Sequence, residues 1–175
     1  YLLTLGPHSF YWFSLERARA SGPPDAGGDE AAPAEIEVDG GWQRMLQPRG
    51  RGRAALERAL RRRLQTQRWF RGKARPIKAV HLIEAIALGA AAREAQLVFV
   101  EVTYEEGDPE IYLMALGFVP GEVAPEGAEI VARLQSRSPG ASGWLVDRSD
   151  DPRVAEALLD VVVRRRRLKG RFSEL

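Results

Sequence analysis

The hydrophobic period of this chain changes within one short stretch, Gln67–Arg75, which also carries two large aromatic and four cationic side chains. Before this stretch, Leu56, Leu60 and Leu64 recur every four residues, which is the spacing of one face of an amphipathic helix. After it, apolar and polar residues alternate, as they do in β-strands. Gly72 is placed to end the helix. The chain must therefore fold so that a helix turns directly into a sheet.

One helix followed by several strands is the order that the sequence predicts. We expect a helix over residues 54–67 and strands over Ile77–Leu88, Ala95–Tyr104, Glu110–Val119, Ala128–Gln135 and Gly143–Val146. The second strand has one wholly apolar face, which favours an antiparallel sheet covered on one side. A last helix is expected from Pro152 to Leu168, with Asp151 as its acidic cap. The predicted fold class is α+β, with an antiparallel sheet of four to five strands packed on an N-terminal helix and followed by a C-terminal helix.

The first part of the chain has a different composition. Tyr1–Leu5 and Ser9–Leu15 are rich in aromatic and branched residues, which predicts two short strands. Two strands alone are marginal in water, so this pair needs a partner sheet. The residues that follow are mainly Ala, Gly, Pro and acidic residues. We therefore expect residues 1–15 to end one module and residues 16–50 to form a flexible linker.

Composition limits the class of protein. The chain of 175 residues is 45% hydrophobic and 29% charged, which is typical of a soluble globular protein. It has no cysteine, so disulfides and thiolate metal sites are excluded. No apolar run reaches the length that a membrane helix needs. We expect a soluble cytoplasmic protein that does not bind a membrane.

Motifs for catalysis or for cofactor binding are not found. Gly72-Lys73 suggests a phosphate loop, but that pattern needs Gly in place of Gln67 and Ser or Thr in place of Ala74. His8 and His81 have no partner at ligand spacing, so no metal site is expected. The acidic residues of Glu101–Glu110 suggest a glycosidase pair, yet a solvated turn explains them as well. We predict no catalytic, cofactor-binding or metal-binding residue in this chain.

Basic residues are concentrated between residues 44 and 75, where 12 of them accompany only one acidic residue. Interleaved with aromatic residues, such a stretch can bind nucleic acid or another polyanion through phosphate contacts and stacking. The alternative interpretation is an amphipathic helix whose solvent face uses arginine. We favour that alternative because the rest of the chain is not basic and no nucleic-acid recognition fold is indicated.

Gln67–Arg75 also carries a family resemblance. Together with the strand Val98–Tyr104 and with Tyr112–Leu116, this stretch resembles the N-terminal cap of bacterial maltokinases. The signature residues are Gln67, Arg68, Trp69, Phe70, Gly72, Lys73 and Arg75. We expect the two aromatics to cover the core where helix and sheet meet. The resemblance implies a curved, cystatin-like sheet over residues 51–147 and the start of the kinase intermediate subdomain over residues 148–175.

A second resemblance concerns the N-terminus. Leu5–Phe13 looks like the last strands of trehalose synthase, which is fused to maltokinase in many bacteria. The two resemblances imply that the parent protein isomerises trehalose to maltose and then phosphorylates maltose with ATP and Mg²⁺, giving maltose 1-phosphate for α-glucan synthesis. The implied partners are the kinase lobes and the trehalose synthase module of the same polypeptide. The kinase residues would lie downstream, so this fragment alone is expected to be inactive.

Overall fold

The computed structural model describes residues 32–89, 92, 94–136 and 142–170. The chain divides into two units, Tyr1–Ala32 and Pro33–Leu175, and all described helices and strands belong to the second. They are β1 (Ala34–Val38), η1 (Trp42–Leu46), α1 (Arg53–Thr66), η2 (Arg71–Ala74), β2 (Ile77–Ala87), β3 (Gln96–Tyr104), β4 (Glu110–Pro120), β5 (Glu129–Ser136), β6 (Gly143–Asp147) and α2 (Pro152–Val163). The two predicted N-terminal strands lie outside the described residues.

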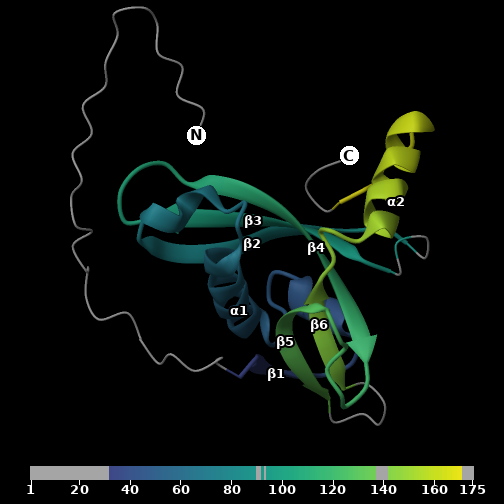
Figure 1. The fold of residues 1–175 in the computed structure, drawn as a ribbon, viewed down its shortest axis with the longest axis horizontal. Helices are drawn as coiled ribbons and strands as arrows, with labels where there is room; N and C mark the ends of the chain where they lie inside the picture. The colour runs from purple at the N-terminus through teal and green to yellow at the C-terminus, as the bar shows by residue number, and fades with distance from the viewer. Residues whose placement is uncertain (1–31, 90–91, 93, 137–141, 171–175) are drawn as a thin grey trace, which may run out of the picture. The chain divides into compact units, whose positions relative to one another are not determined.

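The six strands form one curled, mixed sheet in the order β1-β5-β6-β4-β3-β2 (Figure 1). Every neighbouring pair is antiparallel except β1 and β5, which run parallel. The predicted α+β class and the five predicted strands are confirmed, with ends that differ by a residue or so. The sixth strand makes the sheet mixed where we expected it to be antiparallel.

The sixth strand corrects the predicted linker. Residues 34–46 lie within the range 16–50, yet they form β1 and the 3₁₀ helix η1. Ile36 and Val38 point into the core, and Trp42, Met45 and Leu46 are buried beside them. Every second residue of β1 is acidic, and the segment before it is acidic and rich in Pro and Gly. The short strand pattern therefore resembled the linker composition around it. The rest of the predicted linker up to residue 31 is outside the described residues.

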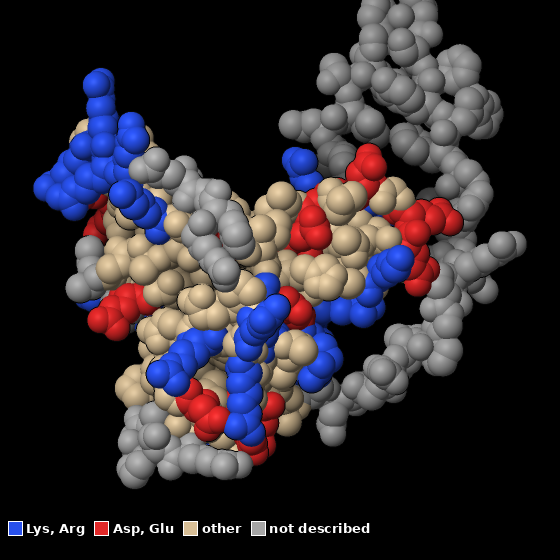
Figure 2. Space-filling model, turned by 180° about the vertical axis from the view of Figure 1, so that it is seen from behind, with Lys and Arg blue, Asp and Glu red and all other residues tan. Residues whose placement is uncertain are grey.

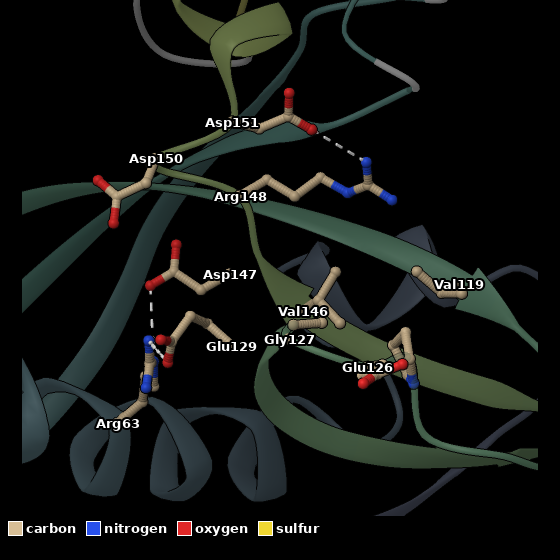
Figure 3. A pocket seen from close by; sticks show the side chains of 12 residues that line it. Arg63, Val119, Glu126, Gly127, Glu129, Val146, Asp147, Arg148, Asp150 and Asp151 are labelled. Atoms are coloured by element: carbon tan, nitrogen blue, oxygen red, sulfur yellow. Dashed lines mark hydrogen bonds and ion pairs between the residues drawn. The ribbon is translucent and has the colours of Figure 1, made fainter.

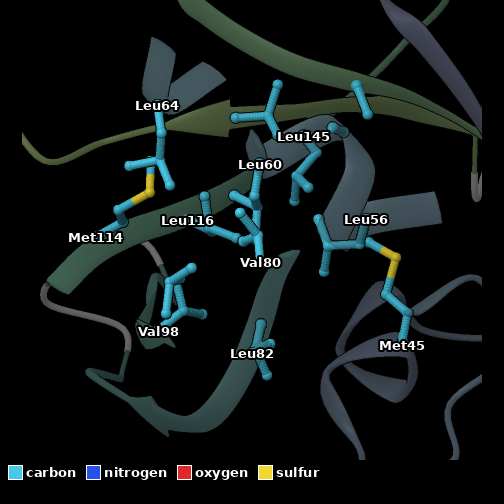
Figure 4. Close-up of a cluster of buried hydrophobic side chains, with 14 of the residues drawn as sticks. Met45, Leu56, Leu60, Leu64, Val80, Leu82, Val98, Met114, Leu116 and Leu145 are labelled. Carbon is cyan, nitrogen blue, oxygen red and sulfur yellow. The ribbon is translucent and has the colours of Figure 1, made fainter. Parts of the chain in front are cut away.

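Helix α1 packs against the sheet through its leucine stripe. Leu56, Leu60 and Leu64 are fully buried. Figure 4 shows these side chains facing residues from four strands of the sheet, namely Val80, Leu82, Val98, Met114, Leu116 and Leu145. A leucine face of this size removes enough apolar surface from water to fix the helix on the sheet. The four-residue spacing in the sequence therefore identified the core face correctly.

Charged side chains of α1 also cover the free edge of β2. Glu57 accepts a hydrogen bond from the Leu82 backbone N–H at 3.0 Å, and Arg53 donates to the Leu82 carbonyl. Arg61 donates to the Ile77 carbonyl at 2.7 Å. An unpaired strand edge invites association with other strands, so these contacts protect β2 from it. Two arginines of the basic stretch therefore stabilise the packing of α1 on β2.

Helix α2 begins as predicted and ends early. Asp151 caps it by accepting the backbone N–H of Arg153 at 2.9 Å, and its apolar face packs on the other side of the sheet. The helix ends at Val163 instead of Leu168 because Arg165 adopts a positive φ of 50°. Figure 2 shows Lys and Arg side chains gathered at the end to which α2 projects, where the run Arg164–Arg167 follows the helix.

Candidate functional site

The signature residues lie where α1 turns into β2, and we call Gln67–Arg75 the tryptophan corner. Gln67 ends α1 by donating its backbone N–H to the Leu64 carbonyl at 3.0 Å. The chain then crosses the start of β4 and forms the short helix η2. Phe70 and Gly72 are buried, whereas the other signature residues lie at or near the surface.

Three aromatic rings meet at the corner. The Phe70 and Tyr112 ring centroids are 5.0 Å apart, and those of Trp69 and Tyr112 are 6.0 Å apart, with both pairs tilted. Gly72 lies directly against this group. A Cβ atom added there would be 2.2 Å from the Tyr104 hydroxyl oxygen and 2.6 Å from the Phe70 ring. Glycine is needed here because of this close approach.

Arg75 connects the corner to the β3–β4 hairpin. Its guanidinium lies 3.5 Å from the ring centroid of Tyr104 and forms an ion pair with Glu110 at 2.9 Å. It also donates to the carbonyls of Glu106 and Asp108, at 3.2 and 2.9 Å. One side chain therefore fixes the hairpin tip to the start of β2.

Glu110 is the centre of a small hydrogen-bonded cluster. Its carboxylate accepts the hydroxyl of Tyr104 at 2.9 Å and also that of Tyr112. Hydrogen bonds from Tyr112 and Tyr104, with the charge of Arg75, hold the pKa of Glu110 below its usual value. Burial and the hydrogen bonds with Tyr112 and Glu110 raise the pKa of Tyr104, and burial also raises the pKa of Tyr112. At neutral pH the phenols stay protonated and donate to an ionised carboxylate, which suits a structural cluster.

The outer side of the corner is left uncovered. Trp69 is 41% exposed, so it covers the core only in part, unlike Phe70. Arg68, Arg71 and Lys73 are exposed and make no ion pair or hydrogen bond within the described ranges. Phe70, Gly72 and Arg75 thus build the corner from within, while Trp69 and the three cations present a surface.

A cavity of about 390 Å³ lies between the end of α1, the β4–β5 loop and the start of α2 (Figure 3). Its lining includes the apolar Val119 and Val146 and carries more carboxylates than arginines. Arg63 forms ion pairs with Glu129 at 2.6 Å and with Asp147 at 3.6 Å. Sequence reasoning missed this group, because its members are widely separated along the chain and follow no known spacing.

Among the acidic residues of Glu101–Glu110, where the sequence suggested a glycosidase pair, the Glu110 side chain is engaged in structural contacts. The carboxylates of the Glu101–Glu110 region do not line the large cavity, and Glu110 is bound to the tyrosines and Arg75. No set of three His, Asp or Glu side chains in the described ranges could hold a metal ion. His81 is exposed on β2, and His8 is outside the described residues.

A model of the maltokinase N-terminal cap domain family matches residues 64–151. The chain belongs to this family. The match begins in the last turn of α1 and ends at the residue that caps α2, so the cap domain includes the tryptophan corner and the strands β2 to β6. No solved structure matches the chain. Within the described ranges, the cap has no helix whose length and apolar character would allow it to cross a membrane.

Proposed function

We propose that this chain is the non-catalytic cap of a maltokinase that is fused to trehalose synthase. In this proposal the whole polypeptide isomerises trehalose to maltose and transfers a phosphoryl group from ATP to maltose, with Mg²⁺ bound in the kinase lobes. The cap holds the nucleotide-binding part of the kinase in place. Membership of the maltokinase cap family supports the kinase part. The synthase part rests on the resemblance of Leu5–Phe13.

The exposed flank of α2 is the observation that carries the proposal. Val154 and Ala157 pack on the sheet, yet Leu159, Val162 and Val163 on another flank are 62%, 73% and 71% exposed. A helix that is apolar around most of its circumference is expected to lie between two packed layers. The sheet is one layer, and we assign the second to the kinase lobes. This assignment agrees with the expectation that residues 148–175 begin the intermediate subdomain of the kinase.

The internal contacts of several arginines support a structural, non-catalytic role for the cap. Arg53 and Arg61 bind backbone carbonyls of β2, Arg75 binds carbonyls of the β3–β4 turn, and Arg63 joins β5 to β6. Side chains fixed in this way hold the fold together and are not available to bind phosphates. Four arginines of the basic stretch that suggested a polyanion ligand are thus explained by internal contacts, whereas Arg68, Arg71 and Lys73 are exposed and make none within the described residues.

A coupled assay tests the absence of catalysis. The purified chain is incubated with ATP, Mg²⁺ and maltose, and ADP release is followed through a pyruvate kinase and lactate dehydrogenase couple. We expect no ADP release above the rate without maltose. The full-length fusion, assayed at the same molar concentration, is the positive control. Maltose-dependent ADP release by the chain alone would refute the proposal.

A further inference from the structure

Strand β4 has a strand on both sides along only part of its length. Over Leu116–Pro120 it pairs with β6, but over Glu110–Ala115 only β3 is paired with it. No other described strand lies beside this first half of β4. We call residues Ile111–Met114 the open β4 edge.

The backbone groups of every second residue of this edge point away from β3. Ala115 donates its N–H to the Ser149 hydroxyl at 3.1 Å and accepts the Arg148 N–H at 2.7 Å, so both of its groups point to the side of β6. Backbone groups alternate in direction along a strand, and the groups of Leu113 and Ile111 therefore point to the same side. Because β6 does not extend that far, these two N–H and two carbonyl groups face no strand in the described part of the chain.

Apolar side chains flank the open β4 edge on both faces of the sheet. Ile111 and Leu113 are 63% and 46% exposed on one face, and the half-exposed Trp69 lies beside Tyr112 on the other. Sheet edges are normally protected by charged side chains, prolines or bulges, and this edge has none of them. The edge of β2, by contrast, is covered by charged side chains of α1. The difference indicates that the open β4 edge receives another strand.

We propose that the open β4 edge pairs in antiparallel fashion with the same edge of a second copy of this chain. Ile111 of one copy lies opposite Leu113 of the other, so that the two residues exchange backbone hydrogen bonds, and the two-fold axis passes beside Tyr112. Four exposed apolar side chains then cover one another on one face. The edge is uncharged and self-complementary, which fits a second copy better than a charged peptide.

The paired segment is short, so the dimer is weak and depends on concentration. It buries less than the roughly 1,600 Å² of a standard protein–protein interface. Light scattering during gel filtration of the whole chain is expected to give 19.4 kDa when dilute and to rise toward twice that mass when concentrated. A constant mass of 19.4 kDa, or growth beyond a dimer, would overturn the proposal.

A charged residue introduced into the open β4 edge tests whether the dimer forms there. Leu113→Lys places a cation opposite Ile111 in both symmetric contacts and is expected to weaken association roughly tenfold. Val162→Lys on α2 is the matched control, because it also replaces an exposed apolar residue, and it should leave the dimer unchanged. The location is wrong if both variants, or neither, change the association constant.

Disulfide cross-linking tests the proposed register between the two β4 strands. The chain has no cysteine, and opposite residues in such a hydrogen-bonded pair are about 5.5 Å apart at Cα, within disulfide range. Under mild oxidation the double variant Ile111→Cys, Leu113→Cys should form a disulfide-linked dimer, each thiol pair losing two electrons and two protons to dissolved oxygen. Val123→Cys in an exposed turn is the control. Equal cross-linking of both variants, or none, contradicts the register. These results do not depend on kinase activity, so they are independent of the proposed function.

Discussion

Replacing Glu57 by alanine is the most direct test of the contact between α1 and β2. The Glu57 carboxylate accepts the Leu82 N–H at 3.0 Å and the Arg53 Nε at 3.2 Å, and both side chains of the ion pair are mostly buried. Glu57→Ala leaves the Leu82 N–H without an acceptor and Arg53 without its counter-ion. A hydrogen bond to a charged group contributes about 1.5–3 kcal/mol, and alanine returns a few tenths through helix propensity. We expect a loss of about 1–2.5 kcal/mol in unfolding free energy.

A second variant separates the hydrogen bond from the charge. Glu57→Gln keeps an oxygen that can accept the Leu82 N–H but loses the ion pair with Arg53, so we expect a smaller loss of about 1 kcal/mol. Arg58→Ala is the matched control on the exposed face of α1 and should stay within about 0.5 kcal/mol of the wild type. Urea unfolding followed by circular dichroism measures all three, provided the slope with urea is unchanged. If Glu57→Ala is no less stable than Arg58→Ala, the contact does not stabilise the fold as we argue.

Three further predictions concern the tryptophan corner and α2. Gly72→Ala should lower the unfolding free energy by about 1–3 kcal/mol because its methyl group collides with the Tyr104 hydroxyl, whereas Gly41→Ala should be nearly neutral in the same urea titration. Since the pKa of Glu110 is lowered by folding, its contribution is present above pH ~4.3 and is lost as the pH falls through the folded value. The stability gap between wild type and Glu110→Gln should therefore close in acid, and a constant gap would contradict the assigned cause. In the full-length protein, which we propose to be a maltokinase, Leu159→Glu should reduce kinase activity while leaving the melting temperature of this isolated chain unchanged; equal activity would show that this flank of α2 does not dock on the kinase lobes.

Local periodicity was sufficient to predict most of the fold. The four-residue leucine spacing identified α1 and its buried face, and alternation identified β2 to β6. It failed at β1, where only Ile36 and Val38 mark a strand, because two apolar residues are too few to stand out. It also placed the end of α2 too late, because the positive φ of Arg165 is not apparent from the arginine run.

The site was predictable only where it is contiguous. Gln67–Arg75 was recognisable as one unusual segment, whereas its partners Tyr104, Glu110 and Tyr112 come from another hairpin. The β3–β4 hairpin brings those three residues together locally, but its contact with Gln67–Arg75 is long-range, since Arg75 and Glu110 are 35 residues apart, and a single sequence does not specify such pairing. The same reason explains why the ion pairs of Arg63 were not foreseen. Residues that act across strands are thus found only once the sheet is known.

Two uncovered apolar surfaces are found among the described residues, and they belong to different elements. The α2 flank contains Leu159 and Val162, and the open β4 edge contains Ile111 and Leu113. A domain with two such surfaces is suited to connect two partners, which we assign as the kinase lobes and a second copy. The two assignments can be tested separately in the full-length protein. Leu159→Glu should lower kinase activity without changing the dimer, and Leu113→Lys should weaken the dimer without changing the activity per chain. If either variant changes both properties, the two surfaces form one interface and the assignment of separate partners is wrong.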